Sequence, residues 1–349
     1  AGFGLFYSGI NIGALLGGAI CVYLGKYHSW SLAFLAAAIV MIIGLITFAF
    51  TKKTLGPIGD SPLLHLPDAK RKTREMLVYA GSLLSIPLIL IMVKNTAYTD
   101  MFMYTIGPVA ILYFMFELMK LKTSADKSKL FAAFLFIAFS ILFWAFFEQS
   151  GGSLSLFAAN NLSDKLLFFH IDPNIVNNTS NSLFVILFSP LVGLLWIGMN
   201  KRKLEPNTVI KFGLGFLFLS AAFYVFYYTR FFADSEGVTS LNIFAMAYLV
   251  ITLGELCLSP IGLSIITKLS PKHLSGMMMG LWFLGSAYGQ YVAGILGAGM
   301  STPNDDASKV EKLMAYTDGY KQLAIYALVC GVILILISSL MKKLMHGVK

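Results

Sequence analysis

Apolar runs of about twenty residues recur along this 349-residue chain, and each is long enough to cross a hydrocarbon core of about 30 Å as a helix. The chain is 57% hydrophobic and only 12% charged, whereas a soluble domain carries about 25% charged residues. Together these observations exclude a soluble fold. They predict an all-α protein that crosses the membrane several times.

The runs that are bounded by polar or charged residues define ten predicted spans. Their limits are 3–24, 30–50, 76–93, 101–119, 130–148, 181–199, 212–229, 241–267, 274–298 and 322–341. Between them, the segments 149–180 and 301–320 are predicted to be the longest external loops.

The net charge of +9 would suggest nucleic acid in a soluble protein, but here the placement of the charges matters more than their total. If the first span starts in the cytoplasm, 19 of the 26 Lys and Arg residues fall in cytoplasmic segments and seven on the opposite side. By the positive-inside rule, this bias predicts that both ends of the chain are cytoplasmic. We expect the lipid bilayer as a partner and no nucleic acid.

Of the seventeen Asp and Glu residues, only Glu117, Glu148 and Glu255 lie within or at the end of an apolar run. Glu117 lies beside Lys120 near a cytoplasmic end, where snorkelling or a local ion pair is the simplest interpretation.

Glu255 lies near the middle of the 241–267 span, where an ionised carboxylate costs about 2.5–3.5 kcal/mol. No Lys, Arg or His of the sequence is predicted at its depth. The carboxyl group must therefore face water, hold a proton, meet a cationic ligand or pair with a residue outside this chain. All four options indicate a transport path or a proton site; a carboxylic acid hydrogen-bonded between helices is the alternative.

Glu148 ends the 130–148 span just before Ser150, Gly151 and Gly152. The glycine pair can break the helix and leave its carbonyl groups facing a cavity. The pattern favours a functional acid, and an interfacial carboxylate is the simpler alternative.

Two bulky or kinking residues follow Glu255. Pro260 would free a backbone carbonyl and kink its helix, which suits either a gate hinge or plain packing. Trp282 lies deeper in its span than the usual interfacial aromatic belt, so it either lines a pocket or packs between helices.

Asn11 lies among Gly9, Gly13 and Gly17. Small residues at this spacing form a helix face that permits close approach of a second helix. Asn11 is therefore either a packing hydrogen bond or a ligand contact.

Four motifs resemble helices of the proton-dependent oligopeptide transporter family and occur in the family's order. Residues 2–13 (GFGLFYSGINIG) resemble the family's fifth helix, and residues 143–149 (FWAFFEQ) its seventh. Residues 254–264 (GELCLSPIGLS) resemble its tenth helix and are the most specific of the four, and residues 278–284 (MMGLWFL) resemble its eleventh.

This resemblance implies a major-facilitator fold of two six-helix bundles. Residues 1–50 would be helices five and six of the first bundle, 51–75 a cytoplasmic linker, 76–121 the lateral helix pair of bacterial members, and 122–349 the second bundle with a cytoplasmic tail. We expect that this chain lacks helices one to four, with the Glu-x-x-Glu-Arg motif of the first and a lysine of the fourth. Part of proton coupling and the binding of a substrate carboxylate would then lie outside it.

The resemblance also implies roles for single residues. Glu255 is similar to the tenth-helix acid that receives a peptide's amino terminus, and Asn11 and Asn181 are similar to the fifth- and eighth-helix amides that help to hold it. Glu148 resembles the seventh-helix acid tied to proton movement and to an extracellular gate. Trp282 resembles a wall of the side-chain pocket.

The implied function is symport of protons with di- and tripeptides by alternating access in a bacterial inner membrane, with no cofactor besides the coupling proton. A carrier of another small solute such as nitrate is one alternative, but an anion carrier has no need of an acid at the amine site. A membrane-embedded enzyme is the other, but it would need a nucleophile–base pair or metal ligands at depth, where no histidine or aspartate is predicted.

Overall fold

A computed structural model describes residues 2–56, 61, 63–301 and 306–348, and the side chains of residues 2–8 and 259–261 lie outside that description. The chain divides into two compact units. The larger consists of Ala1–Ala33 and Leu118–Lys349, and the smaller of Phe34–Glu117. This division differs from the predicted segments, because α1 (Gly2–Tyr27) belongs to the same unit as residues 122–349. The assignment of segments to the two bundles stays a prediction.

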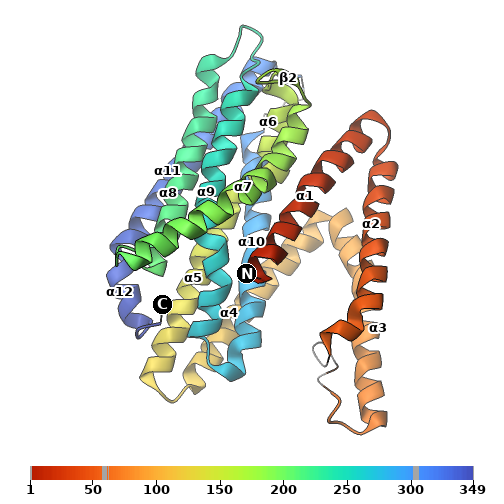
Figure 1. The fold of residues 1–349 in the computed structure, drawn as a ribbon, viewed down its shortest axis with the longest axis vertical. Helices are drawn as coiled ribbons and strands as arrows, with labels where there is room; N and C mark the ends of the chain where they lie inside the picture. Colours follow the sequence, from red (N-terminus) through yellow and green to blue (C-terminus); the bar gives the residue numbers. More distant parts are fainter. Residues whose placement is uncertain (1, 57–60, 62, 302–305, 349) are drawn as a thin grey trace. The chain divides into compact units, whose positions relative to one another are not determined.

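The larger unit is a helical bundle in which α8, α9 and α11 run side by side and α7 crosses at an angle (Figure 1). Besides α1, its long helices are α5 (Ser124–Phe147), α7 (Pro173–Lys201), α8 (Thr208–Tyr228), α9 (Leu241–Leu269), α10 (Ser275–Met300) and α11 (Lys309–Leu336). Shorter elements are η2 (Glu148–Gly151), α6 (Ser153–Asn161), β1 (Lys165–Leu166), β2 (Phe169–His170), η3 (Thr229–Phe232), η4 (Lys272–Leu274) and α12 (Ser338–Leu344).

The smaller unit contains most of α2 (Trp30–Thr51) and of α4 (Thr96–Lys120), with η1 (Lys52–Leu55) and α3 (Asp68–Lys94) between them. None of the described residues of α3 is buried within the protein. Because soluble proteins rarely leave so continuous an apolar surface uncovered, these helices fit a lipid environment.

Nine helices in the described part of the chain are long and apolar enough to cross a membrane. The one predicted span that is not among these nine helices, 274–298, forms the helix α10, whose mean hydropathy is lower. Its seven glycines, Gln290 and two tyrosines dilute its apolar residues. The protein is therefore a multi-pass membrane protein, as predicted.

The two segments predicted to be the longest external loops contain secondary structure, and their external position stays a prediction. Within 149–180 the chain forms η2, α6 and the antiparallel β1–β2 pair, and α7 begins at Pro173. Within 301–320, α11 begins at Lys309. Both early starts have local causes. The Asp172 carboxylate accepts a hydrogen bond from the Asn174 amide at 2.8 Å, and Ser308 with Glu311 forms a capping box.

The close approach of α1 to α7 occurs at Gly18, where a Cβ would lie 3.1 Å from the Asn178 carbonyl oxygen of α7. Among the described residues, open space lies beside Gly9, Gly13 and Gly17. The predicted small-residue face of α1 is therefore not the face that contacts α7, and its role in helix packing stays a prediction.

Two glycines let α8 and α9 touch through their backbones. A Cβ on Gly254 would lie 2.8 Å from the Gly215 carbonyl oxygen, and a Cβ on Gly215 would lie 3.0 Å from the Gly254 carbonyl oxygen. Backbone atoms cannot move aside as a flexible side chain can. This crossing fixes the depth and rotation of α9 immediately beside Glu255.

We predict that Gly254→Ala destabilises the protein by about 1–3 kcal/mol, since the added methyl group overpacks the crossing. Gly280→Ala is the matched control, because Gly280 lies in α10 with open space beside it, and alanine favours a helix interior. Thermal unfolding of both variants in detergent measures the effect. Equal melting temperatures for the two variants would contradict the backbone contact.

Candidate functional site

Glu255 and Asn181 come together between α9 and α7. Glu255 is only 8% exposed, and the Asn181 side-chain amide donates a hydrogen bond of 2.7 Å to its Oε2 atom. The same amide nitrogen lies 3.2 Å from the Thr252 hydroxyl oxygen. The structure therefore places two of the predicted site residues in direct contact, although they lie 74 positions apart in the sequence.

A second pair of side chains joins the same two helices one helical turn further along. The Tyr248 hydroxyl donates a hydrogen bond of 2.6 Å to Asn177 Oδ1, and both residues are buried, at 3% and 2% exposure. Asn177 in turn donates to the Ser150 carbonyl oxygen at 2.9 Å. This pair ties α7 and α9 to η2, the element that follows α5.

The two pairs belong to one set of contacts in which Tyr248 is the covalent link: its hydroxyl bonds Asn177, and its backbone carbonyl oxygen accepts a hydrogen bond of 2.7 Å from the Thr252 hydroxyl. The set runs from Ser150 through Asn177 and Tyr248 to Thr252, Asn181 and Glu255. Sequence analysis missed Asn177 and Tyr248. The available signal was spacing: Asn177 and Asn181 lie four residues apart, and residues 248, 252 and 255 share one helix face.

Glu148 is half-buried at the first position of η2. The Gln290 side chain of α10 lies near its carboxyl group, and the Tyr248 hydroxyl is close enough for the two groups to interact electrostatically. The predicted break after Glu148 is present, but as a 3₁₀ turn that leads into α6.

Gln149 shapes this break. Its buried side-chain amide donates hydrogen bonds to the Ala145 carbonyl oxygen of α5 at 3.2 Å and to the Ala293 carbonyl oxygen of α10 at 3.1 Å. The Ser153 hydroxyl donates to Gln149 Oε1 at 2.7 Å. The bond to Ala145 satisfies one of the carbonyl groups that the end of α5 leaves without a partner, and the bond to Ala293 fixes η2 against α10. Gln149 was part of a quoted motif, but no role was predicted for it.

Three predicted residues lie elsewhere in the larger unit. Asn11 is 7% exposed on α1, the helix that contacts α7. Trp282 is 4% exposed on α10 and packs against α9, where a Cβ on Gly262 would lie 2.3 Å from its ring. Pro260 lies on the α9 backbone, and its side chain is outside the described residues. No group of three or more His, Cys, Asp and Glu residues in the described chain is placed to hold a metal ion.

An ion pair joins α1 to the start of α7. The Lys26 ammonium lies 2.9 and 2.8 Å from the two Asp172 carboxylate oxygens, and the Tyr27 hydroxyl lies 3.3 Å from one of them. Burial opposes the ionisation of Asp172. However, the hydrogen bonds from Lys26, from the Asn174 backbone amide and from Tyr27, together with the Lys26 charge, hold the Asp172 pKa below its ordinary range.

The comparisons with known proteins decide the family. The family model described as POT family matches residues 1–313. The chain belongs to the POT family. It is 29% identical over 360 residues to the peptide transporter YePEPT of Yersinia enterocolitica, covering 99% of this chain and 69% of that protein. It is 27% identical to dipeptide and tripeptide permease B of Aeromonas hydrophila, covering 99% of this chain and 68% of that protein.

A crystal structure of peptide transporter POT in complex with sulfate matches with a TM-score of 0.77 and 30% identity, over 99% of this chain and 69% of that one. This match confirms the predicted fold class, a transmembrane helical bundle of the major-facilitator type. The family resemblance read from the four motifs is likewise confirmed.

We predict that the Lys26–Asp172 pair stabilises the fold at neutral pH and stops doing so in acid. Because the Asp172 pKa is lowered by folding, its contribution is present above the ordinary pKa and is lost as the pH falls through the lowered value. Because this ion pair is partly exposed to solvent, it contributes about 1 kcal/mol or less to the free energy of unfolding.

Thermal unfolding between pH 7 and about pH 3 tests this, since the ordinary Asp pKa is about 3.9. The wild type should lose more stability across this range than Asp172→Asn. Glu236→Gln, which alters an exposed carboxylate in the segment between η3 and α9, should behave as the wild type does. If the stability of Asp172→Asn depended on pH as that of the wild type does, the Lys26–Asp172 pair would not stabilise the fold.

Proposed function

We propose that the complete protein imports di- and tripeptides together with protons by alternating access, and that Glu255 binds the peptide ammonium group. The buried contact between Glu255 and Asn181 carries this proposal. A carboxylate inside a membrane protein is costly unless it is hydrogen-bonded or meets a cation. A peptide ammonium can donate charge-assisted hydrogen bonds to Glu255, which are stronger than bonds between neutral groups.

An ammonium group has three N–H donors, and the neutral groups around the Glu255 carboxylate can accept hydrogen bonds from those that Glu255 does not bind. Asn181 offers an amide oxygen while its nitrogen is directed at Glu255, and we assign Asn11 of α1 to the same site. We assign Trp282 to a wall of the pocket for the peptide side chains, because it packs against α9 beyond Glu255. These assignments follow the family resemblance.

We assign proton binding and gating to Glu148. Its neighbour Ser150 begins the set of contacts that reaches Glu255 through Asn177 and Tyr248. A change of charge at Glu148 would alter the electrostatic potential at the Tyr248 hydroxyl. A ligand bound at Glu255 would compete with the hydrogen bond between Asn181 and Glu255. The two acids would thus bias the same α7–α9 contact, which is the physical requirement for coupling between two sites. Pro260 is proposed as a hinge of α9.

We place the protein in a bacterial inner membrane with both ends cytoplasmic, on the basis of its distribution of cations. We propose no enzymatic activity and no cofactor other than the coupling proton. A nitrate carrier is less favoured, because the buried acid would repel an anion.

We predict that acetylating the amino terminus of a dipeptide weakens its binding at least about tenfold, since a charge-assisted hydrogen bond contributes about 1.5–3 kcal/mol and about 1.4 kcal/mol corresponds to one decade. Competition against a labelled dipeptide measures the effect, with free and acetylated versions of one sequence. In Glu255→Gln the free peptide should bind more weakly and the penalty of acetylation should largely disappear.

Glu117→Gln is the matched control for loss of a carboxylate in an apolar run, and it should keep the full penalty. Equal competition by free and acetylated peptides in the wild type would mean that Glu255 does not bind the amino terminus.

We predict that Glu148→Gln reduces proton-driven peptide accumulation by at least about tenfold, which corresponds to about 1.4 kcal/mol of lost coupling free energy, while peptide counterflow is reduced much less. Counterflow needs only binding and reorientation, whereas accumulation needs a proton to be bound and released. Reconstituted vesicles with and without a pH gradient separate the two activities. An equal loss of both would assign Glu148 to structure or substrate binding.

A further inference from the structure

A cavity of about 730 Å³ lies in the larger unit where the α7–α8 loop, α9 and α12 meet. None of the predicted site residues lines it. Ser264 of α9 lines the cavity and lies nine residues along the helix from Glu255, or about 13 Å at 1.5 Å per residue. In the proposed orientation this end of the bundle is cytoplasmic.

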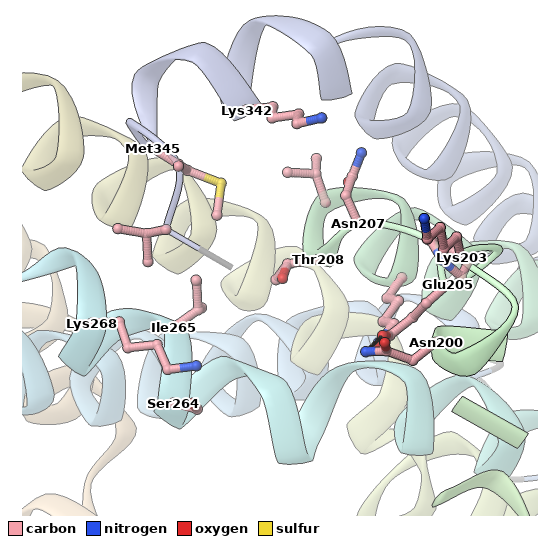
Figure 2. Close-up of a pocket in the computed structure, with 15 residues that line it drawn as sticks. Asn200, Lys203, Glu205, Asn207, Thr208, Ser264, Ile265, Lys268, Lys342 and Met345 are labelled. Carbon is pink, nitrogen blue, oxygen red and sulfur yellow. Dashed lines mark hydrogen bonds and ion pairs between the residues drawn. The ribbon is translucent and has the colours of Figure 1, made fainter. Parts of the chain in front are cut away.

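Lysines enter the cavity from four separate segments. Lys203 lies in the α7–α8 loop, Lys211 on α8, Lys268 on α9 and Lys342 on α12. Figure 2 shows Lys268 and Lys342 reaching in from opposite sides of Thr208. The positive-inside rule explains why lysines are frequent at this face, but it does not require them to converge on one concavity.

The described lining contains one carboxylate, Glu205, and the wall itself compensates its charge. One oxygen of Glu205 pairs with the Lys211 ammonium, and the other accepts a hydrogen bond of 2.6 Å from the Asn200 amide. Lys211 also lies over the Trp196 ring at 4.7 Å and is only 8% exposed. Lys211 and Glu205 therefore form part of the wall, and Lys203 and Lys342 supply positive charge at the cavity.

The remaining lining is amphiphilic. Val209, Ile265 and Met345 are apolar and at most 3% exposed. Asn207 and Thr208 lie at the first turn of α8, where the helix dipole adds positive potential. The cavity thus combines cations, hydrogen-bonding groups and a helix start with an apolar floor.

We propose that this cavity binds a compound that bears a phosphate group. A phosphate group carries up to two negative charges and several acceptor oxygens, and it therefore matches a cavity lined by several lysines better than a single carboxylate does. The volume lies within the range of small-ligand sites, about 300–1,000 Å³, and basic pockets at the cytoplasmic side of membrane helices suit phosphorylated headgroups. The phosphate belongs either to a membrane phospholipid or to a soluble phosphomonoester.

Calorimetric titration of the complete, delipidated protein in dodecyl maltoside tests this site. The probes are dihexanoylphosphatidic acid, glycerol 3-phosphate and inorganic phosphate. We expect saturable binding of at least one probe that weakens as salt is added. Phosphatidic acid binding at least about tenfold tighter than glycerol 3-phosphate would identify a lipid as the source, and equal binding would identify a soluble phosphomonoester.

The double variant Lys203→Gln/Lys342→Gln should weaken binding at least about tenfold. Lys343→Gln is the matched control. Lys343 follows Lys342 on α12 and is exposed as Lys342 is, but it does not line the cavity. It should change affinity less than about twofold. Retained dipeptide binding by every variant confirms that the fold is intact. The proposal is overturned if no probe binds up to about 1 mM, if the double variant binds as the wild type does, or if Lys343→Gln weakens binding equally.

Discussion

The burial of the Glu255 carboxyl group is the constraint on which the rest of this structure depends. An acid at mid-depth needs hydrogen-bond donors or a cation, and α7 supplies a donor through Asn181 at 2.7 Å. That contact requires α7 and α9 to keep one register. The Asn177–Tyr248 pair maintains the register one turn away, and the backbone contact between Gly215 and Gly254 holds α9 against α8. The packing of three helices is therefore organised around one carboxyl group.

The same constraint explains how a local event could be transmitted. The hydrogen bonds between η2 and Glu255 cross from α7 to α9 twice, through Tyr248 and through Asn181. Gln149 fixes η2 against α10, so a displacement at Glu148 cannot be absorbed by a loose loop. Rigid contacts of this kind have discrete arrangements, which allows small changes at one end to select between states of the whole bundle.

Most of the fold followed from hydrophobic run length, because a membrane span must be both apolar and about twenty residues long. The predicted limits of the helices were wrong where the sequence is polar, because the apolar signal is weak there. The starts of α7 and α11 are polar, and their caps at Asp172 and Ser308 lie outside the apolar runs. Glu255 was predictable because an acid is conspicuous in an apolar span. Asn177 and Tyr248 left only the signal of spacing, because their partners lie 27 and 71 positions away in the sequence. Gln149 left none, because polar residues near span ends are common.

The central claim is that Glu255 and Asn181 form the binding site for a peptide ammonium group. A cryo-electron microscopy structure of the complete protein with a bound dipeptide tests it most directly. The account predicts that the ammonium nitrogen lies about 2.7–2.9 Å from a Glu255 carboxylate oxygen and within hydrogen-bonding distance of the Asn181 amide oxygen. A peptide bound with its carboxyl terminus toward α9, or with its amino terminus away from Glu255, would contradict the account.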